Sequence, residues 1–406
     1  MSTFLFDGIG QLALPYASSI DRINPIEVIE DAALLVHDGV VAAAGPKSEV
    51  QAKLPDEYTR IECGGRAVIP GLVDSHTHAV FAGRRVDEFL RRGRGETYEE
   101  IAAAGGGIRN TARAFVEGDI EQVVQESVAR LKRLQALGTT TVEIKTGYGL
   151  SPEAELKHFE AIEALSSFPG MNVMRTLLAH VPPKHQSATS FLDALASAFS
   201  PRFNDLSFID IFVESNAFSP DDARHFRALI PETIPMKLHV DQLHDAGGAQ
   251  LAAELGAISA DHLEFTTAPG MKAMREQGVV ATILPGCGLF LHGSKWPNAR
   301  QMRDHGVQVA VATDLNPGSS HIENLWMCGL AASTQCGLTL EESFWGMTRG
   351  GALALGRPEL GTLREGSSAD LIIMDSDHWA SGLYSPHAPP IFEIWSQGTV
   401  SLSSRA

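Results

Sequence analysis

The chain has 406 residues and a hydrophobic content of 44%, which is enough to bury a large core and excludes intrinsic disorder. It carries 32 Lys and Arg against 49 Asp and Glu, a net charge of −17. We therefore expect neither nucleic acid nor an anionic membrane surface as a partner. An anionic substrate would need a local cation in its binding site.

Four cysteines are present, at Cys63, Cys287, Cys328 and Cys336. None forms a CxxC pair, which argues against a zinc knuckle or a thioredoxin-type motif, and such sparse usage fits a reducing, cytoplasmic location. No basic residue precedes Arg22, so the first residues lack the charged start of a signal peptide. No apolar run approaches the ~18 residues of a membrane span.

Short β-strands are predicted at both ends of the chain. Near the N-terminus, the apolar runs 32–37 and 40–44 flank Asp38-Gly39, a strong hairpin signal. Near the C-terminus, strands are predicted at 369–375 and 391–395. The two β-rich ends indicate one small domain to which both termini contribute.

We expect this β-sandwich domain to comprise residues 1–65 and 361–406, while residues 66–360 alternate between strand and helix patterns. Eight apolar runs each end in polar or turn residues: 67–78, 139–146, 173–180, 208–214, 236–240, 257–264, 279–284 and 307–313. Helices are predicted between such runs, for example over 119–137 and after Ser151. Eight strand–helix units predict an α/β fold of the (β/α)8, TIM-like barrel type.

A doubly wound α/β sheet is the alternative fold for the middle of the chain. Such a sheet usually has a glycine-rich phosphate loop after its first strand. The dense glycine stretch at 104–107 follows a helical pattern instead, so we interpret it as a flexible loop.

Functional residues of a barrel are expected where its strands end. The first strand ends with His76 and His78, and residues at i and i+2 of a strand face the same side. Alone, this pair fits surface histidines as well as a metal site. The fifth run contains His239, the sixth contains His262 and the eighth is followed by Asp314.

Imidazoles with one carboxylate suit a divalent transition metal, Zn or Fe, with one position open for water. A metal lowers the pKa of such a water and makes it a nucleophile near neutral pH. The strand ends therefore predict a metal-dependent hydrolase.

These histidines and the aspartate resemble the metal-dependent amidohydrolase superfamily, in which a composite β domain from both termini is also common. Four longer motifs, at 71–85, 97–108, 142–150 and 312–320, narrow the resemblance to the imidazolonepropionase family. The Glu-Ile-Lys-Thr-Gly-Tyr-Gly stretch and the Asn-Pro-Gly loop are the most specific parts. The resemblance implies ring opening of 4-imidazolone-5-propanoate by water to N-formimino-L-glutamate, a step of histidine degradation.

The resemblance also implies the site residues. The metal ligands are His76, His78, His239 and Asp314. The substrate contacts are Arg85, Tyr148, His180, Gln242, Asn316, Gly318 and Ser319. The catalytic residues are His262, Asp314 and Gln242. The implied cofactor is one divalent metal, Zn or Fe, and the implied assembly is a homodimer with a small-molecule substrate.

Some of these roles follow from chemistry as well. Arg85 offers a planar fork for a propionate carboxylate, although it could equally be a solvated loop arginine, as neighbouring Arg84 could. Gln242 cannot transfer a proton at neutral pH, so it can only orient the substrate. The acid–base work then falls on Asp314 and His262.

Several alternatives remain open. Lys145 could be carboxylated and bridge two metals, as in some superfamily members. Segments 208–215 and 288–296 depart from the family pattern and could reshape the pocket. The chain could thus be another cyclic-amide hydrolase, or a deaminase, acting on a related carboxylate-bearing heterocycle. A metal-free scaffolding barrel is the alternative of a different class, which the complete ligand set disfavours.

Overall fold

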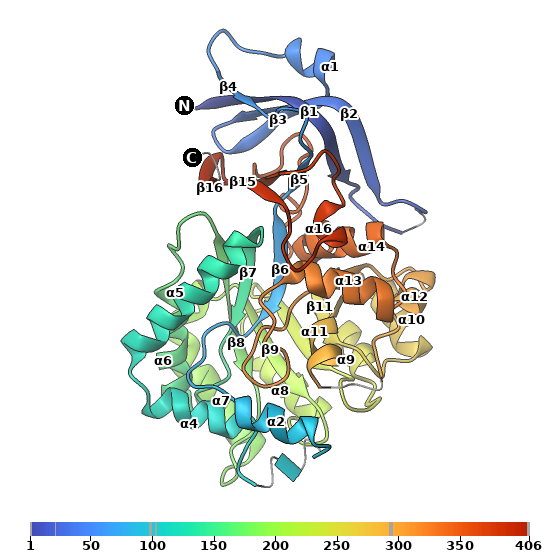
Figure 1. The fold of residues 1–406 in the computed structure, drawn as a ribbon. Coiled ribbons are helices and arrows are strands. Elements are labelled where there is room, and N and C mark those ends of the chain that lie inside the picture. The colour runs from blue at the N-terminus through green and yellow to red at the C-terminus, as the bar shows by residue number, and fades with distance from the viewer. Residues whose placement is uncertain (1, 21, 97–99, 102–103, 292–294, 404–406) are drawn as a thin grey trace.

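The computed structural model describes residues 2–20, 22–96, 100–101, 104–291 and 295–403. Two quoted segments fall partly outside these residues, at 97–99 with 102–103 and at 292–294. The described strands form two eight-stranded sheets, one above the other in Figure 1. Strands from both ends of the chain build the upper sheet, as predicted, and the middle of the chain builds the lower one.

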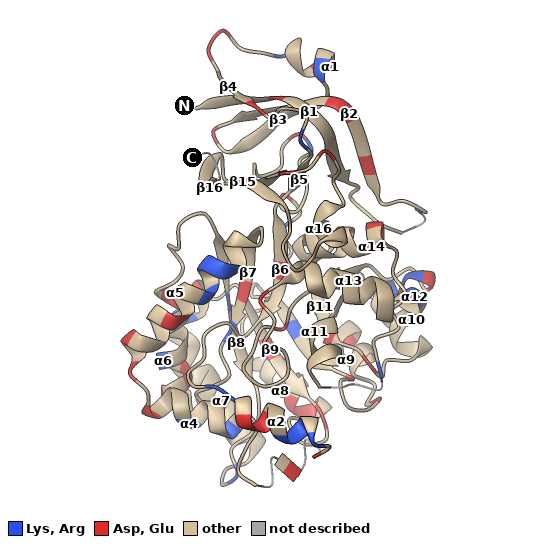
Figure 2. Cartoon of the chain, viewed as in Figure 1, with Lys and Arg blue, Asp and Glu red and all other residues tan. Residues whose placement is uncertain are grey.

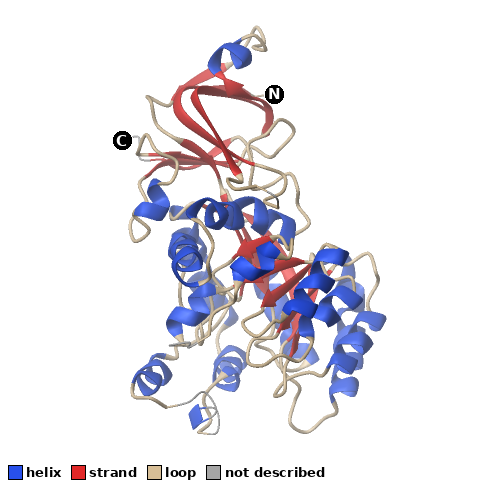
Figure 3. Cartoon of the chain, turned by 90° about the vertical axis from the view of Figure 1, so that its right-hand side faces the viewer, coloured by secondary structure: helices blue, strands red, loops and turns tan. Residues whose placement is uncertain are grey.

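The upper sheet has the order β16-β15-β14-β5-β1-β2-β3, with β4 paired to β1. Its strands are β1 (Thr3–Pro15), β2 (Ile26–His37), β3 (Val40–Pro46), β4 (Thr59–Glu62), β5 (Val68–Pro70), β14 (Leu371–Met374), β15 (Ile391–Ser396) and β16 (Thr399–Ser403). The hairpin predicted at Asp38-Gly39 is confirmed, with positive φ angles of 46° and 78°. Figure 3 shows the strong curvature of this sheet.

Alternation along β14 explains how the upper sheet is fixed to the barrel. Leu371 and Ile373 lie in the core of the small domain with Trp395. Ile372, which points to the opposite face, lies in the large cluster that contains the barrel interior and its covering helices. The small domain is therefore packed on the barrel rather than merely tethered to it.

The lower sheet is a parallel barrel, as expected from the sequence. Its strands are β6 (Leu72–Thr77), β7 (Thr139–Lys145), β8 (Asn172–Ala179), β9 (Phe208–Val213), β10 (Met236–Val240), β11 (Ser259–His262), β12 (Val280–Ile283) and β13 (Val309–Val311). Each overlaps one of the eight predicted runs. Between the first and last strands the circle is closed by a bridge from Thr77 to Leu315 and by a hydrogen bond from the Asp314 N–H to the His76 carbonyl oxygen.

Helices surround the barrel strands (Figure 3). On the barrel they are α2 (Val86–Gly93), α4 (Ile108–Glu117), α5 (Ile120–Ala136), α6 (Pro152–Glu163), α7 (Ala188–Phe199), η1 (Ser200–Asp205), α8 (Pro220–Leu229), α9 (Gly248–Glu254), α10 (Ala268–Gln277), α11 (Pro285–Phe290), α12 (Ala299–Asp304), α13 (Leu325–Gln335), α14 (Leu340–Trp345), η2 (Gly346–Gly350) and α15 (Gly351–Ala354). Of the two remaining short helices, α1 (Lys47–Gln51) contacts β2 and β3 of the upper sheet, whereas α16 (Ser381–Tyr384) contacts α13. Among the described residues, no helix combines the length and the apolar character that crossing a membrane requires.

The structure differs from the expected strands at two places. The run 67–78 is not one strand but two, because β5 belongs to the upper sheet and β6 to the barrel, with Gly71 between them. A Cβ atom at Gly71 would lie only 2.2 Å from Thr140 Oγ1, so the chain passes closely over β7 there. The N-terminal strands are also longer than expected, since β1 continues through a bulge between Phe6 and Ile9.

Candidate active site

The carboxyl ends of the barrel strands surround a cavity of about 400 Å³. Its lining includes every sequence-predicted site residue except His76: His78, Arg85, Tyr148, His180, His239, Gln242, His262, Asp314, Asn316, Gly318 and Ser319. His76 is fully buried beside them. The structure thus brings together residues that are up to 243 positions apart in the sequence.

Backbone conformation at the strand ends helps to aim these side chains. Asp241, His262 and Asp314 all have positive φ angles, of 53°, 85° and 52°. Residues other than glycine adopt this conformation at an energetic cost, and it is concentrated at functional sites. Two of the three are predicted site residues.

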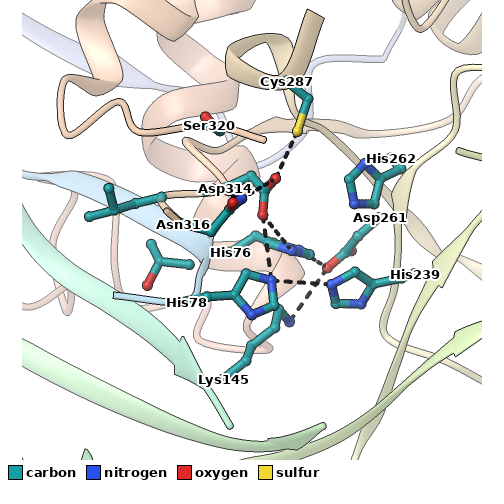
Figure 4. Close-up of polar contacts among 12 residues, drawn as sticks. His76, His78, Lys145, His239, Asp261, His262, Cys287, Asp314, Asn316 and Ser320 are labelled. Carbon is teal, nitrogen blue, oxygen red and sulfur yellow. Dashed lines mark hydrogen bonds and ion pairs between the residues drawn. The ribbon is translucent and has the colours of Figure 1, made fainter. Parts of the chain in front are cut away.

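His76, His78 and His239 form a group whose ligand atoms all lie within 4.8 Å of one another. Nε2 of His78 and Nε2 of His239 are 3.5 Å apart. Oδ1 of Asp314 lies 3.5 Å from Nε2 of His76 and 3.5 Å from Nε2 of His78 (Figure 4). Three imidazoles and one carboxylate oxygen therefore face a common point.

Two buried carboxylates fix the orientation of two of these rings. Asp261 Oδ2 is 2.6 Å from His76 Nδ1, and Asp210 Oδ2 is 3.0 Å from His239 Nδ1. Each carboxylate lies on the Nδ1 side of its ring and leaves Nε2 to face the group, and the contact with His76 is a hydrogen bond. Burial, together with the nearby Lys145 ammonium, lowers the pKa of both histidines well below its usual value, so both rings are neutral.

A layer of fully buried charges lies behind the histidines. Lys145 Nζ is 2.7 Å from Glu143 Oε1, 2.8 Å from Asp210 Oδ2 and 3.7 Å from Asp261 Oδ2. Lys237 Nζ donates to the Ser75 carbonyl oxygen at 2.7 Å and lies 3.2 Å from Glu143 Oε2. The layer links both ring-orienting carboxylates to one ammonium group.

This layer bears on the alternative of a carboxylated lysine. Burial alone would lower the pKa of Lys145, but the adjacent Asp210 and Glu143 carboxylates raise it above its usual value. A protonated amine is not a nucleophile for carbon dioxide. The contacts of Lys145 therefore favour an ammonium group and a site for one metal.

The two oxygens of Asp314 have different surroundings. Whereas Oδ1 faces the histidines, Oδ2 accepts hydrogen bonds from Cys287 Sγ at 2.7 Å and Asn316 Nδ2 at 2.9 Å (Figure 4). Ser319 Oγ lies 3.4 Å from the same oxygen. Burial raises the pKa of Asp314 to about 6. The resemblance assigns Asn316 and Ser319 to substrate contacts. Both side chains also lie against the carboxylate of Asp314, which faces the three histidines.

Arg85 lines the cavity, whereas Arg84 is exposed to solvent. Arg85 Nε donates to Glu88 Oε2 at 2.8 Å, and its Nη2 is 2.7 Å from the same oxygen, with both side chains less than 10% exposed. Its Nη1 lies against Gly318, where an added Cβ would be 1.9 Å away. Helix α2, which begins directly after Arg85, carries both acidic and basic side chains (Figure 2).

Two further histidines complete the cavity. The ring of His180 stacks on that of His78, with centroids 5.5 Å apart and an interplanar angle of 20°. Burial lowers the pKa of His180 to about 4, so this ring is neutral. Burial also acts to lower the pKa of His262, but Glu264, whose Oε1 is 3.7 Å from Nδ1, and Asp314 raise it above its usual value. His262 is therefore the more basic of the two rings.

Sequence reasoning missed several residues that support this site. They are Glu88, Arg92, Asp210, Asp261 and Cys287. Asp261 directly precedes His262 in a strand, so alternation could have placed it behind the site. Nothing in the local sequence distinguishes Cys287 or Arg92, whose Nη2 donates to the Gly318 carbonyl oxygen at 2.8 Å.

Comparison with known proteins decides the family. The imidazolonepropionase of Deinococcus radiodurans is 39% identical over 403 residues, covering 98% of this chain and 99% of that protein. The chain belongs to the imidazolonepropionase family. The enzyme of the same name from Methylobacterium nodulans is 42% identical over 364 residues, covering 88% of this chain and 90% of its own length.

Broader comparisons agree with this membership. A model described as "Amidohydrolase family" also matches residues 209–402. A solved triazine hydrolase variant superposes with a TM-score of 0.77 at 19% identity, covering 99% of this chain and 95% of that one. A guanine deaminase from C. acetobutylicum gives a TM-score of 0.72 at 15% identity, covering 98% and 100%. At such identities, these likenesses extend to the fold alone.

Proposed function

We propose that this imidazolonepropionase-family member hydrolyses 4-imidazolone-5-propanoate to N-formimino-L-glutamate. One observation carries the proposal: the cavity that holds His78, His239 and Asp314 is also lined by Arg85. A propionate group needs a cation, and the guanidinium of Arg85 is the right shape for a carboxylate.

The donor set fits a divalent metal. His76 Nε2 is buried without a hydrogen-bond partner among the described residues, and it faces the Asp314 carboxylate and the other rings. We assign His76, His78, His239 and Asp314 as ligands of one ion, for which Zn and Fe are both suited. When bound, the ion would lower the pKa of a water molecule and polarise the ring carbonyl.

The chain's own residues divide the proton transfers. His262 and Asp314 accept or steer the proton of the attacking water, and His262 returns it to the ring nitrogen as the C–N bond breaks. Gln242 orients the substrate through hydrogen bonds, since an amide does not transfer protons at neutral pH. The raised pKa of His262 suits this exchange.

Binding and orientation fall to the other lining residues. Arg85 binds the propionate, and Tyr148 and His180 contact the ring. The Asn316–Ser319 turn supplies polar atoms, while apolar side chains such as Phe212 and Leu291 limit the entry of water. We also propose a cytoplasmic location, which the four buried, unbridged cysteines suit. The homodimer that the family resemblance implies is likewise a proposal.

A ring-opening assay tests the function. Purified, metal-replete protein is mixed with fresh 4-imidazolone-5-propanoate, and the loss of imidazolone ultraviolet absorbance is followed with and without a chelator. We expect rapid conversion that chelation abolishes, and a much higher KM for Arg85→Met. A metal-loaded protein that leaves this substrate intact would overturn the proposal in favour of another carboxylate-bearing cyclic amide.

A further inference from the structure

We propose that Glu155 and His158, neighbours on one face of α6, are positioning residues that hold Tyr148 at the substrate through the backbone of its loop. The inference rests on the proposed function for the role of Tyr148. It concerns residues 147–150, between β7 and α6, in which four consecutive N–H groups are bound by these two side chains.

Glu155 binds three of the four amides. Its Oε2 accepts from the Gly147 N–H at 2.7 Å, and its Oε1 accepts from the N–H groups of Gly149 and Leu150, each at 2.8 Å. The side chain is buried, and hydrogen bonds to a charged acceptor are about twice as strong as neutral ones. The carboxylate therefore defines the path of the loop on both sides of Tyr148.

His158 binds the fourth amide. Its Nδ1 accepts from the Tyr148 N–H at 3.3 Å, so its proton lies on Nε2, which donates to the Val80 carbonyl oxygen at 2.9 Å. The rings of His158 and Tyr148 are also stacked, with centroids 5.7 Å apart and an interplanar angle of 26°. One histidine thus holds Tyr148 by its backbone and by its ring.

The loop needs such support because its backbone is unusual. Gly147 and Leu150 have φ angles of 113° and 57°. A Cβ on Gly149 would lie 2.3 Å from the Glu155 nitrogen, so the loop lies directly against the start of the helix. In this conformation the amides at 147–150 do not pair with a neighbouring strand, and the two α6 side chains bind them instead.

His158 also connects this loop to the segment that follows β6 and contains the proposed metal ligand His78. Val80, its second partner, is two residues after His78. The rings of His78 and Tyr148 have centroids 6.0 Å apart. His158 therefore connects Tyr148 to the segment that carries the proposed ligand His78. Neither Glu155 nor His158 is among the described residues that line the cavity, so both act through Tyr148.

Hydrogen–deuterium exchange tests the contacts without any need for activity. We expect Glu155→Gln to speed exchange of the amides at 147, 149 and 150 by ~10-fold or more, because an amide side chain cannot accept from all three. His158→Gln should speed exchange of the Tyr148 amide alone. This second variant tests the proposal if Glu155→Gln does not fold. Glu160→Gln, an exposed carboxylate on the same helix, is the matched control. Unchanged exchange in both variants would overturn the proposal.

A double-mutant cycle tests the link to catalysis. We expect Glu155→Gln or His158→Gln to lower kcat/KM by ~10- to 100-fold in the wild-type background but by little in Tyr148→Phe, with metal content unchanged. An equal loss in both backgrounds would mean that these residues do not act through Tyr148, and would overturn the proposal. If the wild type itself leaves the substrate intact, the proposed function fails, while the exchange result still decides whether the loop is held as described.

Discussion

The backbone N–H of Asp314 donates to the carbonyl oxygen of His76 at 3.0 Å. This bond helps to close the barrel between β6 and the residues after β13, and it joins two of the proposed metal ligands. The next bond of the same kind runs from the His78 N–H to the Leu315 carbonyl oxygen at 2.9 Å. Main-chain bonds thus hold Asp314 beside His76 and His78.

We therefore expect that removal of the metal lowers the stability of the protein but does not unfold the barrel. An ion that binds only the folded chain adds about 2.7 kcal/mol when free metal is 100 times its Kd. We expect His78→Ala to lose bound metal and to show no rise of Tm on metal addition, while keeping its far-ultraviolet circular dichroism. His225→Ala, a partly exposed histidine paired with Asp193, is the control and should keep both metal and Tm response. Elemental analysis and thermal melts check this.

The division of proton transfer can be tested by two substitutions. His262→Asn removes the proposed acid–base group, so we expect kcat to fall by about 10²–10⁴-fold. Gln242→Glu keeps the shape of a side chain that only orients the substrate, so the loss of kcat should be far smaller. Steady-state kinetics with equal losses in the two variants would contradict this assignment.

Gly318 leaves room for the Arg85 guanidinium. Because an added Cβ would lie 1.9 Å from Arg85 Nη1, we expect Gly318→Ala to displace the guanidinium and to raise KM by ~10-fold or more, with a smaller change in kcat. Gly93→Ala, on neighbouring α2, is the matched control because its Cβ would meet nothing within 4 Å. An unchanged KM in Gly318→Ala would show that this contact does not position Arg85.

Lys145 compensates buried carboxylates, so its removal should destabilise the fold. We expect Lys145→Met to lower the free energy of unfolding by about 3–5 kcal/mol, since it leaves Glu143 and Asp210 without their ammonium partner. The double variant Lys145→Met/Asp210→Asn should recover part of the loss, whereas Lys132→Met on the exposed side of α5 should change little. Urea unfolding provides the measurement.

Glu155 should also contribute to acid sensitivity. Burial acts to raise its pKa, but hydrogen bonds from the amides of Leu150 and Gly147 help to hold that pKa below its usual value. A carboxylate with a lowered folded-state pKa stabilises the fold above its unfolded pKa of about 4.3 and loses that effect as pH falls through the folded value. Unfolding of Glu155→Gln should therefore depend less on pH below about 4.5 than unfolding of the wild type. Parallel curves for the two proteins would contradict this role.

The barrel and the position of its site were predictable because parallel strands end on one side of the sheet. The order of His76, His78, His239, His262 and Asp314 at strand ends was therefore sufficient to expect one cavity. The buried residues that contact the proposed metal ligands were not predictable in this way. Asp210 and Cys287 contact His239 and Asp314 only after the barrel closes, and short polar side chains at such positions have no sequence pattern of their own.

The division of the predicted strand at Gly71 shows a different limit of prediction from the sequence. Residues 67–73 of the run 67–78 carry no polar side chain, and periodicity alone cannot distinguish one buried strand from two strands in different sheets. What separates β5 from β6 is pairing with distant partners, β1 and β14 for the first and β7 for the second. The helix predicted after Ser151 places residues 155 and 158 on one face, but the sequence alone does not show which backbone amides they bind.

The place of β5 in the upper sheet has a consequence for synthesis of the chain. β5 pairs with β1 on one side and with β14 on the other. As the ribosome makes the protein, β1 to β5 emerge first, and the β14 side of β5 stays unpaired until the whole barrel has been translated. The newborn chain thus carries an open strand edge for most of its elongation, and only the last stretch to leave the exit tunnel covers it.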